Sequence, residues 1–133
     1  MKNDIYEHLK FRLDDEHNDF EFEIISIPPY EFIENNLSLV PYEYFGEINE
    51  VLGLKVKQIL LYFNADRLMR VELKYKENRV ENLKNRLTEL LVYFPNSVTL
   101  KLSYHDEEDV TILMYQKRVL NKFYDFGVTK NVK

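Results

Sequence analysis

Two adjacent stretches in the middle of the chain alternate between apolar and polar side chains. The first, residues 54–63, alternates over its first half and becomes apolar on both sides from Ile59 onward. This pattern predicts a strand that is buried on both faces over half its length. The second stretch, residues 67–75, alternates throughout and places four apolar side chains on one face: Met69, Val71, Leu73 and Tyr75. Because Asn64-Ala65-Asp66 between them has the chemistry of a turn, the two stretches predict an antiparallel hairpin.

A helical pattern follows the predicted hairpin. Asn78 and Glu81 have the spacing of a capping box, and apolar residues behind them recur at helical intervals: Val80, Leu83, Leu87, Leu90 and Leu91. This pattern predicts an amphipathic helix whose apolar stripe packs on a sheet. Beyond Pro95, residues 98–104 and 110–117 read as two further strands around an acidic turn. Residues 54–117 therefore predict a strand-strand-helix-strand-strand unit with an antiparallel sheet.

The first third of the chain is less regular. Apolar residues spaced four apart predict a short helix over about residues 4–16. Residues 19–27 alternate and predict a strand that Pro28-Pro29 stops. Residues 42–52 predict a second helix that ends at Gly53, with one apolar side: Phe45, Ile48, Val51 and Leu52.

These elements predict one α+β domain over residues 1–133, with a mainly antiparallel sheet of about five strands and two to three helices packed on it. The domain has three parts: an acidic N-terminal α/β arm (1–53), the ββαββ core (54–117) and a C-terminal tail (118–133). The chain has 133 residues, of which 45% are hydrophobic and 14% aromatic. That composition is enough for a packed core and argues against disorder.

The net charge of −5 hides an asymmetry between the arm and the rest of the chain. Residues 1–53 contain 13 acidic and 3 basic residues, a net of −10, and residues 54–133 contain 10 and 15, a net of +5. Two interpretations carry equal weight. Either the acidic arm packs against the basic part and is neutralised internally, or an acidic face is kept for a basic partner.

No motif for catalysis, cofactor binding or metal binding is present. The chain has no cysteine, and His8, His17 and His105 are not spaced as zinc ligands. His17 lies in an acidic run that lacks the glycine and distal glutamate of a calcium loop. Three glycines cannot make the usual phosphate-cradling loops, and no nucleophile motif occurs. The sequence therefore predicts no catalytic residue, cofactor or metal, and a protein that is not an enzyme.

The N-terminal residues have acidic side chains where a secretory signal would have an apolar core, and no apolar run approaches the length of a membrane span. With no cysteine to suggest an oxidising environment, the sequence predicts a cytoplasmic protein that does not enter a membrane.

The best candidate for a binding surface is the segment 30–50, where aromatic residues alternate with glutamates. Tyrosine supplies contact area at low entropic cost, and carboxylates steer a basic partner. On the predicted helix Glu43, Glu47 and Glu50 share one face, Phe45 belongs to the core, and at least one of Tyr42 and Tyr44 is exposed. The predicted partner-binding residues are Tyr30, Glu31, Glu34, Tyr42, Glu43, Tyr44, Glu47 and Glu50.

Small size, acidity and tyrosine content favour a binding protein that neutralises or regulates a protein partner with a basic surface, in the manner of an immunity protein, an antitoxin or a phage inhibitor. One alternative is a nucleic-acid-associated module that uses the basic hairpin of residues 55–76, which the acidic total charge disfavours. Another is a small metal-independent enzyme with a dispersed site. The sequence does not indicate the oligomeric state.

Overall fold

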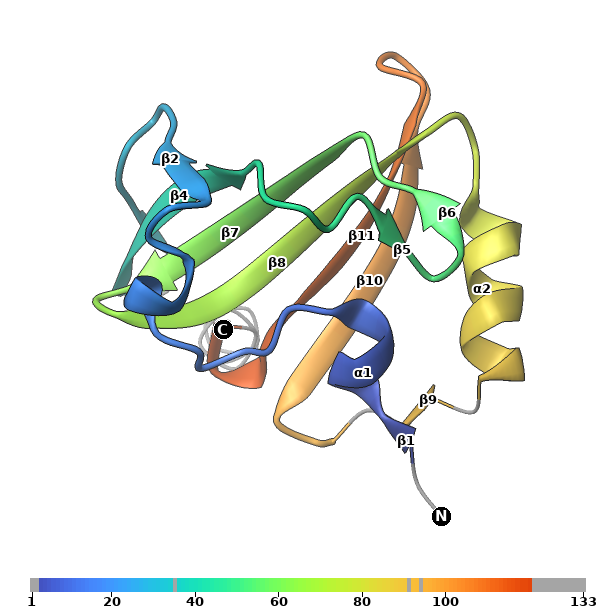
Figure 1. Cartoon of the computed structure of the whole chain (residues 1–133), viewed down its shortest axis with the longest axis horizontal. Helices are drawn as coiled ribbons and strands as arrows, with labels where there is room; N and C mark the ends of the chain where they lie inside the picture. Colours follow the sequence, from blue (N-terminus) through green and yellow to red (C-terminus); the bar gives the residue numbers. More distant parts are fainter. Residues whose placement is uncertain (1–2, 35, 91, 94, 121–133) are drawn as a thin grey trace, which may run out of the picture.

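The computed structural model describes residues 3–34, 36–90, 92–93 and 95–120. Its main feature is a seven-stranded, fully antiparallel sheet with the order β10-β11-β8-β7-β4-β2, in which β3 also pairs with β4 (Figure 1). The strands are β2 (Ile24–Ser26), β3 (Phe32–Glu34), β4 (Leu37–Tyr44), β7 (Gln58–Asn64), β8 (Arg67–Lys76), β10 (Val98–His105) and β11 (Val110–Lys117). The α+β class and the antiparallel sheet are confirmed, and the strand count exceeds the five predicted.

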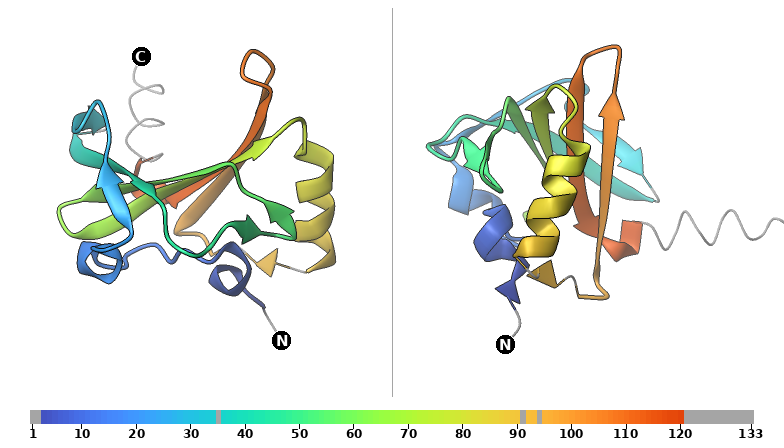
Figure 2. Two further views of the ribbon diagram at one scale, coloured as in Figure 1. Left: turned by 45° about the horizontal axis from the view of Figure 1, so that its top comes forward. Right: turned by 90° about the vertical axis from the view of Figure 1, so that its right-hand side faces the viewer.

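Shorter elements surround this sheet. Two small ladders are formed by β1 (Asn3–Asp4) with β9 (Val92–Tyr93) and by β5 (Glu50–Val51) with β6 (Leu54–Lys55). The helices are α1 (Ile5–Leu9), the 3-10 helix η1 (His17–Phe20) and α2 (Val80–Glu89). In both views of Figure 2, α1 and the β5–β6 ladder lie on the same side of the sheet. Helix α2 stands at one end of the sheet (Figure 1). No helix in the described part of the chain is long and apolar enough to cross a membrane.

The predicted hairpin of residues 54–75 is present, with its first strand divided. β7 and β8 are joined by the two residues Ala65-Asp66, and Ala65 has a positive φ of 53°. Residues 54–55 leave the main sheet and pair with β5 instead. The reason is a sharp change of direction at Val56 and Lys57, whose amides donate to Asn49 (2.9 Å) and to Lys74 (2.7 Å).

A bulge in β8 changes which side chains reach the core. The β7–β8 register shifts between Tyr62 and Phe63, so that Leu68 lies opposite Phe63 and Met69 has no partner. Leu68 therefore joins the main core with Val71, whereas Met69 packs in a separate small cluster with Leu39 and Leu120. The prediction that Met69 and Val71 share a face was wrong, because an extra residue reverses the alternation.

The N-terminal segment covers the core face of the sheet. Ile5, Leu9 and Phe11 are at most 2% exposed and belong to the main cluster. The Tyr115 hydroxyl donates to the carbonyl of Phe11 (2.5 Å), which fixes the segment against β11. The predicted helix over residues 4–16 is wrong beyond Leu9, because Lys10 and Asp14 have positive φ values that a helix cannot contain.

The second predicted helix, over residues 42–52, is also wrong. Residues up to Tyr44 belong to β4, where Tyr42 lies opposite Leu61 and Tyr44 opposite Ile59 of β7. Sheet hydrogen bonds on both sides of β4 replace those of a helix. Pro41, which lacks an amide donor, still accepts a hydrogen bond from Ile27 (3.3 Å). The strand predicted for residues 19–27 is confirmed only at Ile24–Ser26, preceded by η1.

Helix α2 occupies most of its predicted range. The Asn78 side chain accepts a hydrogen bond from the amide of Val80 (3.2 Å), and the predicted reciprocal bond from Glu81 is not formed. Leu83 is the fully buried residue of α2, while Leu87 packs against the core only partly. The predicted Leu91 and most of the predicted tail, residues 121–133, lie outside the described residues.

Candidate functional site

The tyrosines of the predicted binding segment face the core rather than solvent. Residues two apart on a strand share a face, so Tyr42 and Tyr44 both point inward: Tyr44 is 7% exposed and Tyr42 is half-buried. The expectation that at least one of them is exposed was therefore wrong. The Tyr42 ring packs edge-on against His17 (4.9 Å between ring centroids) and Phe63 (5.6 Å).

Tyr44 organises the loop that follows β4. Its hydroxyl accepts a hydrogen bond from the amide of Ile48 (3.2 Å), and its ring contacts Phe11 edge-on at 4.9 Å. A Cβ atom on Gly46 would lie 2.3 Å from this hydroxyl, so only glycine fits there. Burial raises the pKa of Tyr44, and the nearby carboxylates of Glu23 and Glu47 raise it further. Tyr44 is therefore a structural residue of the loop.

Two of the predicted glutamates have partners within the chain. Glu34 forms an ion pair with Arg70, whose Nε also donates to Gln116 (2.7 Å) and whose guanidinium lies 5.2 Å from the Tyr62 ring centroid. Glu31 accepts a hydrogen bond from the Ser38 hydroxyl. These contacts hold the β3–β4 hairpin together and against β8.

The acidic arm is partly neutralised by the core. Three ion pairs cross from one part to the other: Asp14–Lys117 (2.6 Å), Glu16–Arg67 (3.4 Å) and Glu34–Arg70. Other acidic residues of the arm form no ion pair within residues 3–34, 36–90, 92–93 and 95–120: Glu21, Glu43, Glu47 and Glu50. Internal neutralisation therefore applies to Asp14, Glu16 and Glu34, and the interpretation of an acidic face kept for a basic partner stays a prediction.

The predicted glutamates are not gathered on one face. Without the helix, Glu43, Glu47 and Glu50 cannot form its acidic stripe. Glu43 lies in β4 and Glu50 begins β5, and these strands lie toward different ends of the molecule in Figure 1. Tyr30 is 60% exposed in the loop between β2 and β3.

Several exposed apolar side chains lie in or beside the strands at one edge of the sheet. Their positions include both faces, since Ile25 lies opposite Glu43 and Ile33 opposite Ser38, five residues apart on β4. β2 and β3 pair one after the other with the same side of β4, so together they form this edge. Five of the seven large exposed apolar residues in the described structure lie in these two strands, in the residues that flank them or just after β4: Phe22 (86% exposed), Ile25 (59%), Tyr30 (60%), Ile33 (68%) and Phe45 (62%). We call these five residues, with β2 and β3, the β2–β3 edge.

Of the five exposed residues of the β2–β3 edge, only Tyr30 was among the predicted binding residues, and Phe45 was predicted to belong to the core. Phe45 is instead held beside the start of β2, where its amide donates to the carbonyl of Glu23 (2.8 Å). The position of Ile25 in the sequence could have indicated its exposure, because Ile25 lies on the face that carries Glu21 and Glu23 in the alternating pattern of residues 19–27. An apolar residue at a polar position can mark an exposed contact.

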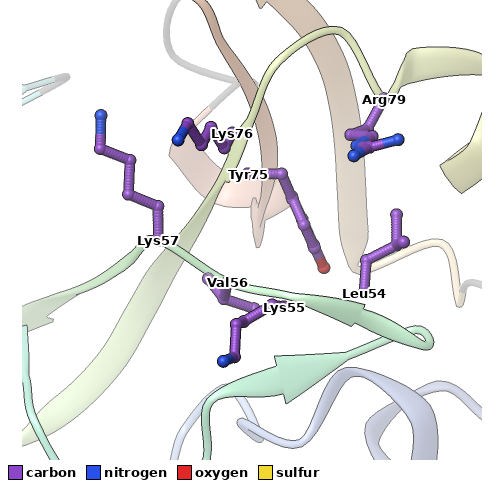
Figure 3. Close-up of a pocket in the computed structure, with 7 residues that line it drawn as sticks. All are labelled: Leu54, Lys55, Val56, Lys57, Tyr75, Lys76 and Arg79. Carbon is purple, nitrogen blue, oxygen red and sulfur yellow. The ribbon is translucent and has the colours of Figure 1, made fainter.

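Basic residues of the predicted hairpin have two different settings. Arg67 and Arg70 form the ion pairs given above. Lys55, Lys57 and Lys76 line a pocket of about 550 Å³ together with Leu54, Val56, Tyr75 and Arg79 (Figure 3). This basic pocket lies near β6 and the start of α2, at the opposite end of the molecule from β2 (Figure 1).

Within the described residues, no group of three or more His, Cys, Asp or Glu side chains is arranged to hold a metal ion. No protein-family model, curated protein or solved structure matches the chain.

Proposed function

We propose that this chain is a small acidic binding protein that neutralises or regulates a protein partner with a basic surface, as immunity proteins, antitoxins and phage inhibitors do. The partner docks on the β2–β3 edge. The observation that carries the proposal is the concentration of large exposed apolar side chains on this one edge. The cysteine-free sequence suits action in a reducing cytoplasm.

Exposed apolar side chains of this size have an unfavourable free energy of hydration, which is relieved when a partner buries them. Single exposed apolar residues are common on soluble proteins, but a concentration of them indicates an interaction site. Phe22 and Ile33 are more than two-thirds exposed; Ile33 is held in the β3–β4 ladder, and Phe22 lies in the turn two residues before β2. A partner that buries them gains apolar contact without having to order the surface first.

The edge also offers backbone groups. Within the described residues, β2 pairs with β4 on one side and with no strand on the other. A strand of the partner could add to β2, so that main-chain hydrogen bonds supply affinity and Ile25 contributes a side-chain contact. Only three residues of β2 are available, which limits non-specific pairing.

Carboxylates near the edge favour a basic partner. Glu43 lies directly opposite Ile25 in the β2–β4 ladder, and Glu21 precedes Phe22. Neither forms an ion pair in the described structure. Unpaired acidic groups beside an apolar surface accelerate association with a positively charged surface.

The test begins with capture of the partner from source cells and measurement of its affinity for purified wild-type chain. We expect Phe22→Ser with Ile25→Ser to weaken binding by about tenfold or more, because truncating interface anchors costs about 2 kcal/mol or more. Tyr104→Ser with His105→Ser is the matched control, since both residues are exposed and lie in β10, at the opposite end of the strand order from β2. Equal losses in the two double variants would contradict the proposal, provided that circular dichroism shows both folded.

Charge reversal tests the electrostatic part separately. Glu21→Lys with Glu43→Lys should slow association and leave dissociation nearly unchanged, and the difference should shrink in high salt. Glu107→Lys with Glu108→Lys makes the same change of net charge in the turn between β10 and β11. If both pairs slow association equally, only net charge matters and the acidic residues of the edge have no special role.

A further inference from the structure

The basic pocket is built where three elements meet. The link from β6 to β7 provides Leu54 to Lys57, the end of β8 provides Tyr75 and Lys76, and Arg79 stands at the start of α2. In Figure 3, Lys57 and Lys76 extend on one side of the Tyr75 ring, Arg79 lies on the other side, and Lys55 points away from them.

The floor of the pocket is rigid. Tyr75 is 1% exposed, and its hydroxyl donates to the carbonyl of Val51 (3.0 Å), which ties β8 to the β5–β6 ladder. The amide of Arg79 donates to the hydroxyl of the fully buried Thr111 (2.7 Å), and this hydroxyl donates to the carbonyl of Glu77 (2.8 Å). The backbone that carries Arg79 is therefore fixed before any ligand arrives.

The lining is basic without compensation inside the pocket. Four of its seven residues are Lys or Arg, and none is Asp or Glu. Outside the pocket Arg79 pairs with the exposed Glu77 at 3.1 Å, and Glu50 lies opposite Lys55 in the β5–β6 ladder. Lys57 and Lys76 have no ion pair within the described residues. Lys57 and Lys76 also lie on the same side of Tyr75, so an anion bound beside them would interact with two positive charges that have no acidic partner.

From this geometry we infer that the basic pocket binds a small phosphorylated ligand of about nucleotide size. Ammonium and guanidinium groups donate strong, charge-assisted hydrogen bonds to phosphate oxygens. The volume of about 550 Å³ is typical of small-molecule sites, and Leu54 with Val56 provides an apolar wall for the rest of the ligand.

Because the pocket is remote from the β2–β3 edge, this inference stands or falls independently of the proposed partner. The experiment titrates the full chain with ATP, with inorganic pyrophosphate and with a short single-stranded oligonucleotide, using calorimetry at low salt. We expect ATP to bind to the wild-type chain. Lys57→Glu with Lys76→Glu should raise the dissociation constant for ATP by about tenfold or more, because each lysine that is lost removes a charge-assisted hydrogen bond to phosphate.

Lys84→Glu with Lys101→Glu is the matched control, since it changes the net charge equally at two exposed lysines outside the pocket. Retained ATP binding in this control, together with its loss in the pocket variant, supports the inference. Equal weakening in both variants, or no binding of ATP and pyrophosphate to the wild type, overturns it. Binding of the oligonucleotide alone also overturns it and assigns the basic residues to nucleic acid. Binding of pyrophosphate without binding of ATP overturns the inference that the ligand is about the size of a nucleotide.

Discussion

Two leucines on helix α2 allow a direct test of how the helix packs. Leu83 is fully buried in the main core, whereas Leu87, one turn later, is only partly buried. Leu→Ala is the same chemical change at both positions and has nearly the same small effect on helix propensity. Any difference in stability between the two variants therefore reports burial.

The expected costs follow from the atoms removed. Truncating Leu83 removes three buried carbon groups at about 0.8 kcal/mol each, and the cavity left in a closed core brings the loss to about 3–5 kcal/mol. At Leu87 part of the side chain already meets water, and solvent can fill the space, so we expect a loss of about 1–2 kcal/mol. The pattern of apolar residues alone assigned Leu87 to the buried stripe, and the structure lowers that expectation.

Urea denaturation followed by circular dichroism measures both costs. With a slope of about 2 kcal/mol per M, the midpoint should fall by about 1.5–2.5 M for Leu83→Ala and by less than about 1 M for Leu87→Ala. The slope should be unchanged in both, which shows that the unfolded state is not altered. A larger loss for Leu87→Ala than for Leu83→Ala would mean that α2 is rotated about its axis relative to the structure described above.

Three further predictions concern buried polar groups. Tyr75→Phe removes the donor to the Val51 carbonyl and should lower the free energy of unfolding by about 1–3 kcal/mol, measured by urea denaturation. Burial raises the pKa values of Tyr62, Tyr75 and Tyr115 above 10.0, so the folded chain retains protons that the unfolded chain releases. The contribution of these three tyrosines to the free energy of unfolding should be fully present below about pH 10 and be lost above it. A urea midpoint that rises from pH 9 to about pH 11 would refute this. The buried Nε2 of His17 has no hydrogen-bond partner in the described structure. His17→Phe should therefore increase the free energy of unfolding by about 1 kcal/mol and raise the melting temperature. A clear decrease in melting temperature would show that this nitrogen has a hydrogen-bond partner in solution.

The part of the fold that the sequence predicts well is made of neighbouring strands. β7 with β8, and β10 with β11, are each joined by short polar turns, so their pairing depends on residues that are close in the chain. The period of two in residues 67–75 and 98–104 is then sufficient evidence. The bulge at Met69 was not predicted from the sequence, because it depends on the register between β8 and β7 and no local sequence pattern indicates it.

β4 shows why the remaining part was misread. Residues 42–44 were assigned to a helix because Phe45, Ile48, Val51 and Leu52, which follow them, have helical spacing, and the local signal against this interpretation is Gly46. The strand is selected instead by pairing with β7 on one side and with β2 and β3 on the other. Such pairing can override local preference, because many ladder hydrogen bonds outweigh a weak helical tendency.

Prediction of the candidate sites failed for a related reason. An apolar residue on an edge strand, such as Ile33, has the same local pattern as one in the core. The lysines of residues 55–76 were noticed as a basic surface, but the pocket also needs Arg79, which the start of α2 brings to it. Sequence composition shows that charges are abundant, and only the tertiary arrangement shows which of them share a cavity.

The hydrogen bond from Tyr115 to the carbonyl of Phe11 joins residues that are 104 positions apart in the chain. During synthesis residues 5–11 leave the ribosome long before β11 exists to receive them. Ile5, Leu9 and Phe11 must therefore wait, with their apolar side chains uncovered, until the strands of the sheet have formed. We expect the nascent chain to leave these side chains uncovered until β11 has formed, so the core closes only after this late strand has joined the sheet.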